Sequence, residues 1–150
     1  MEYRSNSPGE TEALGAALAK LLWPGAVVAF TGDLGAGKTA FVRGMAQGLG
    51  VAGRVTSPTF TILQVHEEGR LPLYHFDWYR LESAEELYEL AMDEYLQNGG
   101  VAVVEWPCRA PEAVPACRLE VEITALGDTD RALCFTPVGG FRELDWTGKD

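Results

Sequence analysis

One segment, residues 32–39 with the sequence GDLGAGKT, constrains the fold of this chain more than any other. It fits the P-loop pattern G-x-x-x-x-G-K-[ST]. The apolar run 27–30 precedes it, and the helix-like stretch 39–49 follows it. An ordinary glycine-rich turn is the alternative, but a strand–loop–helix context is what the P-loop requires. The segment therefore predicts a site for the phosphates of a nucleotide.

The residue types of this segment suit that chemistry. Glycines let the backbone approach the phosphates closely, and the N–H groups at a helix N-terminus point toward bound anions. Lys38, which we expect in a surface loop, places a mobile cation at the β- and γ-phosphates, and the Thr39 hydroxyl can bind magnesium. Lysine is otherwise rare, because only Lys20 and Lys149 accompany it.

Composition predicts one globular domain over residues 1–150. Hydrophobic residues make up 47% of the chain, which is ordinary for a protein with a packed core. No apolar run approaches membrane-spanning length and the first residues are polar, so we expect a cytoplasmic protein without a membrane segment. The three cysteines are scattered and form no C-x-x-C pair, which indicates neither a disulfide framework nor a zinc site.

The formal net charge of −10 is unevenly distributed. Residues 1–80 hold seven acidic and seven basic side chains, whereas residues 81–150 hold fifteen acidic and five basic ones. Because phosphate contacts dominate nucleic-acid affinity, we expect no tight direct binding to nucleic acid. Four arginines allow a local basic patch, and the alternative is that they are solvated or pair with nearby acids: Arg43, Arg54, Arg70 and Arg80.

The first half of the chain predicts two helices around the P-loop strand. Residues 7–10 resemble a capping box, and apolar residues recur at helical spacing up to Pro24 and Gly25. Residues 26–31 are apolar throughout, as in a buried strand. In the helix over 39–49, a stripe of apolar residues ends before Gly50, which suits a helix C-terminus.

Residues 56–60, with the sequence TSPTF, allow two interpretations. Hydroxyl groups beside a proline after a P-loop helix are typical of a switch segment, but a plain turn entering a strand fits equally well. Residues 59–66 and 71–76 predict an antiparallel hairpin that ends at Asp77. His66 and His75 have no metal-ligand spacing, which favours structural roles. His75 and Asp77 share a strand face, so a hydrogen bond between them is an option.

The second half supplies a carboxylate for the P-loop. Residues 83–96 predict an acidic helix, either a solvated face or a docking face for a basic partner. Residues 101–104 are four apolar residues followed by Glu105, a Walker-B pattern that brings a carboxylate beside the P-loop. Residues 107–116 indicate a loop, and residues 118–124 and 131–136 indicate a second hairpin. Residues 141–150 receive no assignment.

These elements predict an α/β fold: a single P-loop NTPase domain whose central mixed sheet is flanked by helices and carries antiparallel hairpins. The order of its motifs resembles TsaE, formerly YjeE, the P-loop ATPase family of bacterial tRNA threonylcarbamoyladenosine synthesis. The P-loop, SPTF at 57–60, DWYRL at 77–81 and EW at 105–106 carry the resemblance. It is strong over residues 26–107 and weaker elsewhere.

The resemblance implies an ATP-hydrolysing subunit that acts with a TsaD-like transferase and a TsaB-like scaffold. Hydrolysis would reset that complex between turnovers, with ATP and Mg²⁺ bound. Asp77 is the expected hydrolytic acid, Thr59 belongs to the switch-like segment, and Thr39 and Glu105 are the expected magnesium ligands. The phosphates are expected at Leu34, Gly35, Ala36, Gly37, Lys38 and Thr39, with Trp106 and Arg131 as further nucleotide contacts.

Other functions remain as alternatives at this stage. A small-molecule kinase needs a lid with arginines, and the arginines after Glu105 are scattered. A nucleotide-dependent binding switch with little turnover is a further alternative. A GTPase is disfavoured because the sequence has no N-K-x-D guanine-recognition motif. The sequence does not determine which carboxylate orients the attacking water.

Overall fold

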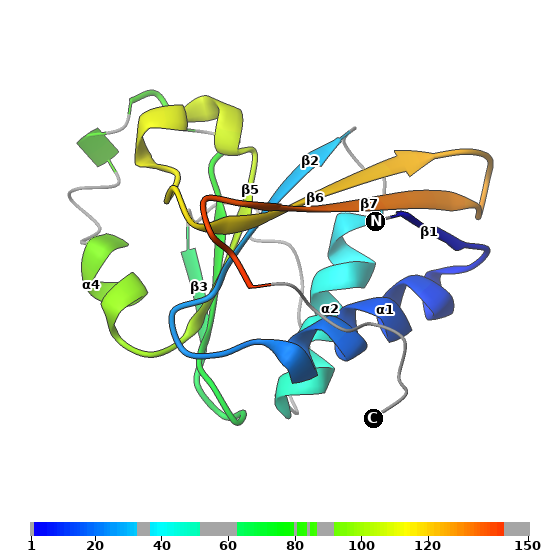
Figure 1. Cartoon of the computed structure of the whole chain (residues 1–150), viewed down its shortest axis with the longest axis horizontal. Helices are drawn as coiled ribbons and strands as arrows, with labels where there is room; N and C mark the ends of the chain where they lie inside the picture. Colours follow the sequence, from blue (N-terminus) through cyan, green and yellow to red (C-terminus); the bar gives the residue numbers. More distant parts are fainter. Residues whose placement is uncertain are drawn as a thin grey trace.

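A mixed seven-stranded sheet forms the centre of the protein (Figure 1). The computed structural model describes residues 2–32, 37–51, 63–79, 81–83, 85–86 and 92–142. The strand order is β1-β7-β6-β2-β5-β4-β3. The strands are β1 (Glu2–Ser5), β2 (Val27–Gly32), β3 (Leu63–His66), β4 (Leu73–Asp77), β5 (Val101–Glu105), β6 (Arg118–Ala125) and β7 (Arg131–Val138).

The P-loop strand β2 occupies the middle of this sheet. It pairs in parallel with β5 on one side and with β6 on the other, and β5 pairs in parallel with β4. Antiparallel strands complete both edges, with β3 on β4, β7 on β6, and β1 on β7. Residues that follow the parallel strands therefore meet at one edge of the sheet, where ligands bind in open α/β folds.

The two predicted hairpins and the predicted Walker-B strand are confirmed. The pair β3 and β4 forms the first hairpin over its described residues 63–77, and β6 and β7 form the second. The strand β5 lies directly beside β2, as the position of Glu105 requires. The sequence analysis missed β1, because its alternation is too short to distinguish an edge strand from a polar terminus.

Helix α1 (Pro8–Leu21) begins as its sequence predicts. Ser7 is the N-cap, and its Oγ accepts a hydrogen bond of 3.1 Å from the Glu10 N–H group. The Glu10 side chain accepts a bond of 2.8 Å from the Asn6 N–H group, one residue before the position used in a capping box. Both bonds satisfy donors that the helix itself cannot pair.

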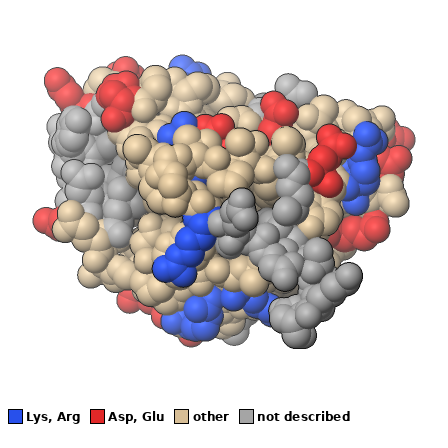
Figure 2. Space-filling view, viewed as in Figure 1, with Lys and Arg blue, Asp and Glu red and all other residues tan. Residues whose placement is uncertain are grey.

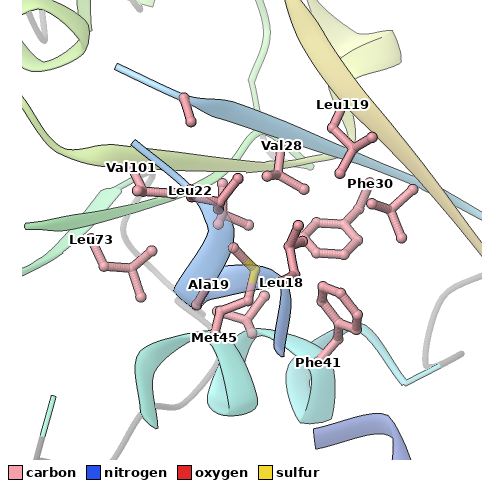
Figure 3. Close-up of a cluster of buried hydrophobic side chains, with 14 of the residues drawn as sticks. Leu18, Ala19, Leu22, Val28, Phe30, Phe41, Met45, Leu73, Val101 and Leu119 are labelled. Atoms are coloured by element: carbon pink, nitrogen blue, oxygen red, sulfur yellow. The ribbon is translucent and has the colours of Figure 1, made fainter. Parts of the chain in front are cut away.

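Helices α1 and α2 (Lys38–Leu49) pack together against one face of the sheet (Figures 1 and 3). Phe30 from β2 meets Phe41 from α2 with their rings 5.4 Å apart, edge to face. The helices approach closely because glycines line their contact. A Cβ atom at Gly44 would overlap the carbonyl oxygen of Glu12. This packing fixes α2, and with it the residues that follow the P-loop.

A smaller apolar cluster covers the opposite face of the sheet. Trp78 and Ala110 pack there against alternate residues of β4 and β5 such as Phe76 and Val104. The predicted loop 107–116 contains two short 3₁₀ helices, η1 (Pro107–Arg109) and η2 (Pro111–Ala113). Helix α4 (Met92–Gln97) is the end of the predicted acidic helix, much of which lies outside the described residues.

The unassigned C-terminal segment begins in contact with Trp23, which follows α1. Phe141 is buried, with its ring 4.7 Å from that of Trp23, and the Arg142 guanidinium lies 4.3 Å from the same indole. Residues 143–150 lie outside the described part of the chain. Among the described residues, no helix is both long and apolar enough to cross a membrane.

Candidate active site

The junction between β2 and α2 carries the end of the P-loop. Gly37 is the N-cap of α2 and has a φ of 103°, a left-handed conformation that glycine adopts without strain. Lys38 and Thr39 follow in the first turn, so their backbone N–H groups belong to the helix N-terminus. The predicted phosphate-binding residues Leu34, Gly35 and Ala36 lie outside the described residues.

Lys38 is not on a surface loop, contrary to expectation, because it is the first residue of α2 and only 5% exposed. Its Nζ atom lies 4.4 Å from the centroid of the Trp106 ring. The negative face of an indole attracts a cation in this way. Trp106 follows β5, so this contact connects the P-loop lysine to the end of the Walker-B strand.

Two carboxylates meet at the ends of adjacent parallel strands. Asp77 ends β4 and Glu105 ends β5, and the two residues lie opposite each other in the register of the strands. On its other side, Glu105 lies opposite Phe30 of the P-loop strand. This register places both carboxylates at the end of the sheet where β2 leads into the P-loop.

The environment of Asp77 disfavours its ionised form. Burial raises the pKa of Asp77, and the nearby negative charge of Glu105 raises it further. A hydrogen bond of 3.0 Å from the Tyr79 N–H group to Asp77 Oδ1 opposes this shift in pKa, as do the charges of His75 and Lys38. The electrostatic fields of three other site residues therefore converge on this carboxyl group.

His75 bonds to Glu105 rather than to Asp77. The distance between His75 Nε2 and Glu105 Oε2 is 2.5 Å, and the imidazole is fully buried. The sequence analysis allowed a hydrogen bond between His75 and Asp77. The structure instead gives His75 a partner on the neighbouring strand β5. Sequence alternation gives the face of a residue, but it does not give the partner on the next strand.

Trp106 adopts a conformation that is unusual for its residue type. Its φ of 60° is the only positive φ of a non-glycine residue in the described part of the chain. Such conformations persist only where the surroundings hold them. Its ring lies 4.9 Å from that of Tyr79, and the Arg109 guanidinium lies 5.3 Å from Tyr79. Lys38, Trp106, Tyr79 and Arg109 thus form a continuous series of cation–ring and ring–ring contacts.

An open cavity of about 350 Å³ adjoins this series. Lys38 and Trp106 line one side of it, and residues of β2, β6, η1 and η2 line the rest. Arg118 and Glu120 at its margin form an ion pair of 2.7 Å. The cavity therefore begins at the P-loop lysine and extends over the sheet face opposite to α1 and α2.

Arg131 lies beside the P-loop, as its predicted role requires. A Cβ atom at Gly37 would lie 3.7 Å from Arg131 Nε. The Arg131 Nη1 atom donates to the carbonyl oxygens of Gly127 and Asp130, at 3.0 and 2.9 Å. Thr59 and the switch-like segment 56–60 lie outside the described residues, so their predicted roles stay predictions.

The donor set at this edge suits magnesium. The Thr39 hydroxyl and the Glu105 carboxylate are hard oxygen ligands, and Mg²⁺ is commonly bound by one or two protein oxygens together with phosphates and water. In the part of the chain that the structure describes, no group of three or more His, Cys, Asp or Glu side chains forms a metal cage. A bound nucleotide would therefore have to complete the coordination.

The sequence that forms this site matches a protein-family model. The model described as "Threonylcarbamoyl adenosine biosynthesis protein TsaE" matches residues 5–133, which include β2, α2, β4 and β5. The chain belongs to the TsaE family.

Relatives of this TsaE-family chain are similar over nearly their whole length. A "tRNA threonylcarbamoyladenosine biosynthesis protein TsaE" from Bacillus subtilis is 44% identical, over 96% of this chain and 90% of the relative. A protein of the same description from Streptomyces coelicolor is 44% identical, over 91% and 94%. The crystal structure of Bacillus subtilis YdiB matches with a TM-score of 0.78 and 41% identity, over 93% and 86%. The predicted family and fold class are confirmed.

We predict that Asp77→Asn stabilises the fold at neutral pH. Because the folded state raises the pKa of Asp77, the ionised side chain costs stability at pH values above that pKa. The neutral amide removes this cost and keeps the acceptor for the Tyr79 N–H group. Below the ordinary Asp pKa of 3.8, the wild-type carboxyl is also neutral and the advantage disappears. Urea unfolding of both proteins across this pH range measures the difference, which we expect to stay below about 1 kcal/mol because the group is half-exposed.

The exposed Asp128, in the turn between β6 and β7, provides the control. Asp128→Asn should show a smaller gain in stability at neutral pH than Asp77→Asn. A lower stability of Asp77→Asn at neutral pH, constant across the range, would contradict the assigned electrostatics. It would mean that the carboxylate is held by favourable contacts.

The structure brings to this site three residues to which the sequence analysis gave no site role. Tyr79 and Arg109 extend the contacts of Trp106, and His75 binds Glu105. His75 had a recognisable signal, because a histidine two residues before the predicted catalytic acid must share its strand face. Tyr79 lies in the DWYRL motif at 77–81, but no sequence pattern indicates that it meets Trp106 and Arg109, because these residues come from segments that are distant in the sequence.

Proposed function

We propose that this chain is the ATP-hydrolysing accessory subunit in the formation of N6-threonylcarbamoyladenosine in tRNA. Its hydrolysis would reset a complex of TsaD-like transferase and TsaB-like scaffold proteins between turnovers. The observation that carries the proposal is the convergence of Lys38, Asp77 and Glu105 at one edge of the sheet, beside the N-terminus of α2, in a chain of the TsaE family.

The proposed chemistry is mainly positioning and charge stabilisation. The N–H groups at the start of α2 and the Lys38 ammonium bind the phosphates of ATP. For this, the ammonium shifts from the Trp106 ring toward the β- and γ-phosphates. Magnesium, held by Thr39 and Glu105, supplies charge neutralisation when it is bound. Arg131 contacts the nucleotide beside Gly37.

Asp77 is the proposed hydrolytic acid. The raised pKa of its carboxyl group makes it a better proton acceptor than an exposed aspartate. Its hydrogen bond from the Tyr79 N–H group holds Oδ1 and restricts the rotation of the carboxyl group. Glu105 bonds to the buried His75, whereas Asp77 bonds to a backbone N–H group, so the two carboxylates have separate partners and separate proposed roles.

Partner proteins, rather than RNA alone, are the proposed binding targets. On the face of the protein that Figure 2 shows, Lys and Arg side chains lie in separate groups, with acidic side chains between and around them. A net charge of −10 repels an RNA phosphate backbone at long range. Formation of a modified nucleoside in tRNA also places the proposed activity in the cytoplasm.

The kinase alternative receives less support from the arginine positions. Arg118 pairs with Glu120, and Arg142 covers Trp23. Arg109 lies against Tyr79, and Arg131 bonds to carbonyl oxygens of its own turn. A kinase lid would gather several such side chains on one mobile segment over the phosphates.

Phosphate release tests the proposal. We expect slow release of phosphate from ATP by the isolated chain, because so small a protein has little material to exclude water from the site. Release should increase when TsaB-like and TsaD-like proteins are added together. Binding to that pair should differ between ATP and ADP, whereas binding to tRNA alone should be weak and strongly salt-dependent.

Other outcomes would identify a different function or contradict the proposed role. Transfer of phosphate to a small acceptor would identify a kinase. Nucleotide-dependent binding to the partner pair without any phosphate release would identify a binding switch. Tight binding of tRNA by the isolated chain, or a partner complex that does not respond to the nucleotide, would contradict the proposed role.

A further inference from the structure

His75 is a buried histidine in the middle of a strand that otherwise contributes to the core. Its neighbours along β4 on the same face are Leu73, which is fully buried, and Asp77. The imidazole is itself 0% exposed. Burying an imidazole costs free energy unless its nitrogens find partners, and a leucine or phenylalanine would fill such a position without that cost. The position therefore needs an explanation other than packing.

Among the described residues, the imidazole makes one hydrogen bond, to Glu105, and this bond offers a reason for its burial. The His75 Nε2 atom lies 2.5 Å from Glu105 Oε2, whereas Nδ1 is buried and has no hydrogen-bond partner among the described residues. An ionised carboxylate only accepts hydrogen bonds, so the proton of this bond is on Nε2.

Glu105 requires such a donor for its orientation. Its side chain is 6% exposed, and its carboxylate lies at the end of β5 with β2 and β4 on either side. A hydrogen bond to Oε2 fixes the rotation of the carboxylate and offsets its loss of water. Asp77 on the neighbouring strand is held by a different donor, the Tyr79 N–H group. Each carboxylate is thus oriented separately.

We propose that His75 is a positioning residue that fixes the Glu105 carboxylate for magnesium. This inference rests on the magnesium role proposed for Glu105. Residues that orient the ligands of a metal ion typically change its affinity by about 10- to 100-fold when they are replaced. In this proposal His75 acts through its bond to Glu105, so it is a positioning residue and not a catalytic one.

The test compares two replacements of His75 in the full chain. His75→Phe fills the space without a donor, and His75→Gln keeps an N–H donor near the position of Nε2. The measurement is the affinity for ATP by calorimetry, in a Mg²⁺ titration and in EDTA, with thermal unfolding alongside. We expect His75→Phe to raise, by about 10-fold or more, the Mg²⁺ concentration at which the increase in ATP affinity is half-maximal. The affinity in EDTA should change by less than about twofold, and His75→Gln should recover most of the Mg²⁺ response.

His66, on the adjacent strand β3, provides the matched control. It is another histidine of the same hairpin, and its Nε2 atom is buried without a partner among the described residues. His66→Phe should leave the Mg²⁺ response unchanged. If His75→Phe fails to fold, His75→Leu, a smaller replacement without a donor, is compared with Glu105→Gln and with the double variant. Independent, additive effects of His75→Leu and Glu105→Gln on the Mg²⁺ response would then overturn the inference.

The inference and the proposed function fail in different ways. An unchanged Mg²⁺ response in a folded His75→Phe protein would overturn the positioning role and leave the proposed function intact. A wild-type protein that binds ATP equally with Mg²⁺ and with EDTA would overturn the magnesium role of Glu105, and the inference with it. A lower melting temperature of His75→Phe with a normal Mg²⁺ response would identify His75 as a purely structural residue.

Discussion

Replacing Lys38 with alanine should lower the rate of ATP hydrolysis by at least about 100-fold, because it removes the cation that stabilises charge on the transferred phosphoryl group. The ammonium already lies at the site, 4.4 Å from the Trp106 ring centroid. Phosphate release by the variant, alone and with the partner proteins, measures the effect. Calorimetry with ATP shows whether binding is lost as well.

The effect of lost packing has to be separated from the effect of lost charge in this experiment, because the Lys38 residue is 95% buried at the start of α2. Its methylene groups contribute contacts that alanine removes. Lys38→Met keeps most of these contacts and removes the ammonium group, so the variant should fold like the wild type and be as inactive as Lys38→Ala. The exposed Lys20 at the end of α1 is the control for surface charge, and Lys20→Ala should retain full activity. An active Lys38→Met protein would show that Lys38 is a structural residue.

The sequence predicts the fold of this chain best where a pattern is long or chemically exacting. The four apolar residues before Glu105 and the strand before the P-loop were placed side by side because a P-loop needs its Walker-B strand close by. The two hairpins followed from alternation and short turns. The edge strand β1 has only four residues, too few for such a pattern to emerge.

The site was predictable in its residue types but not in its contacts. The P-loop and Walker-B patterns identified Lys38 and Glu105, and the family resemblance added Asp77. No sequence pattern specifies that Glu105 bonds to a histidine on the next strand, or that Lys38 lies over Trp106. Such contacts depend on strand register and on the unusual φ of Trp106, which only the assembled sheet determines.

Glu105→Gln and Asp77→Asn should have different effects, because the two carboxylates have different partners. Glu105→Gln removes the charge that binds magnesium, so the tightening of ATP binding by Mg²⁺ should weaken by at least about 10-fold. Asp77→Asn removes the proton acceptor, so the hydrolysis rate should fall by about 100-fold while the ATP affinity changes less than about twofold.

The choice of glutamine follows from the structure. Alanine at position 105 would leave the buried Nε2–H group of His75 without a partner, at a cost of about 1–3 kcal/mol in stability. The glutamine amide keeps an oxygen that accepts this bond, so a loss of Mg²⁺ response reports on the charge alone. Glu112→Gln, at an exposed carboxylate of η2, should behave like the wild type. Equal losses of ATP affinity in Glu105→Gln and Asp77→Asn would contradict the division of roles, because both carboxylates would then bind the metal–nucleotide complex.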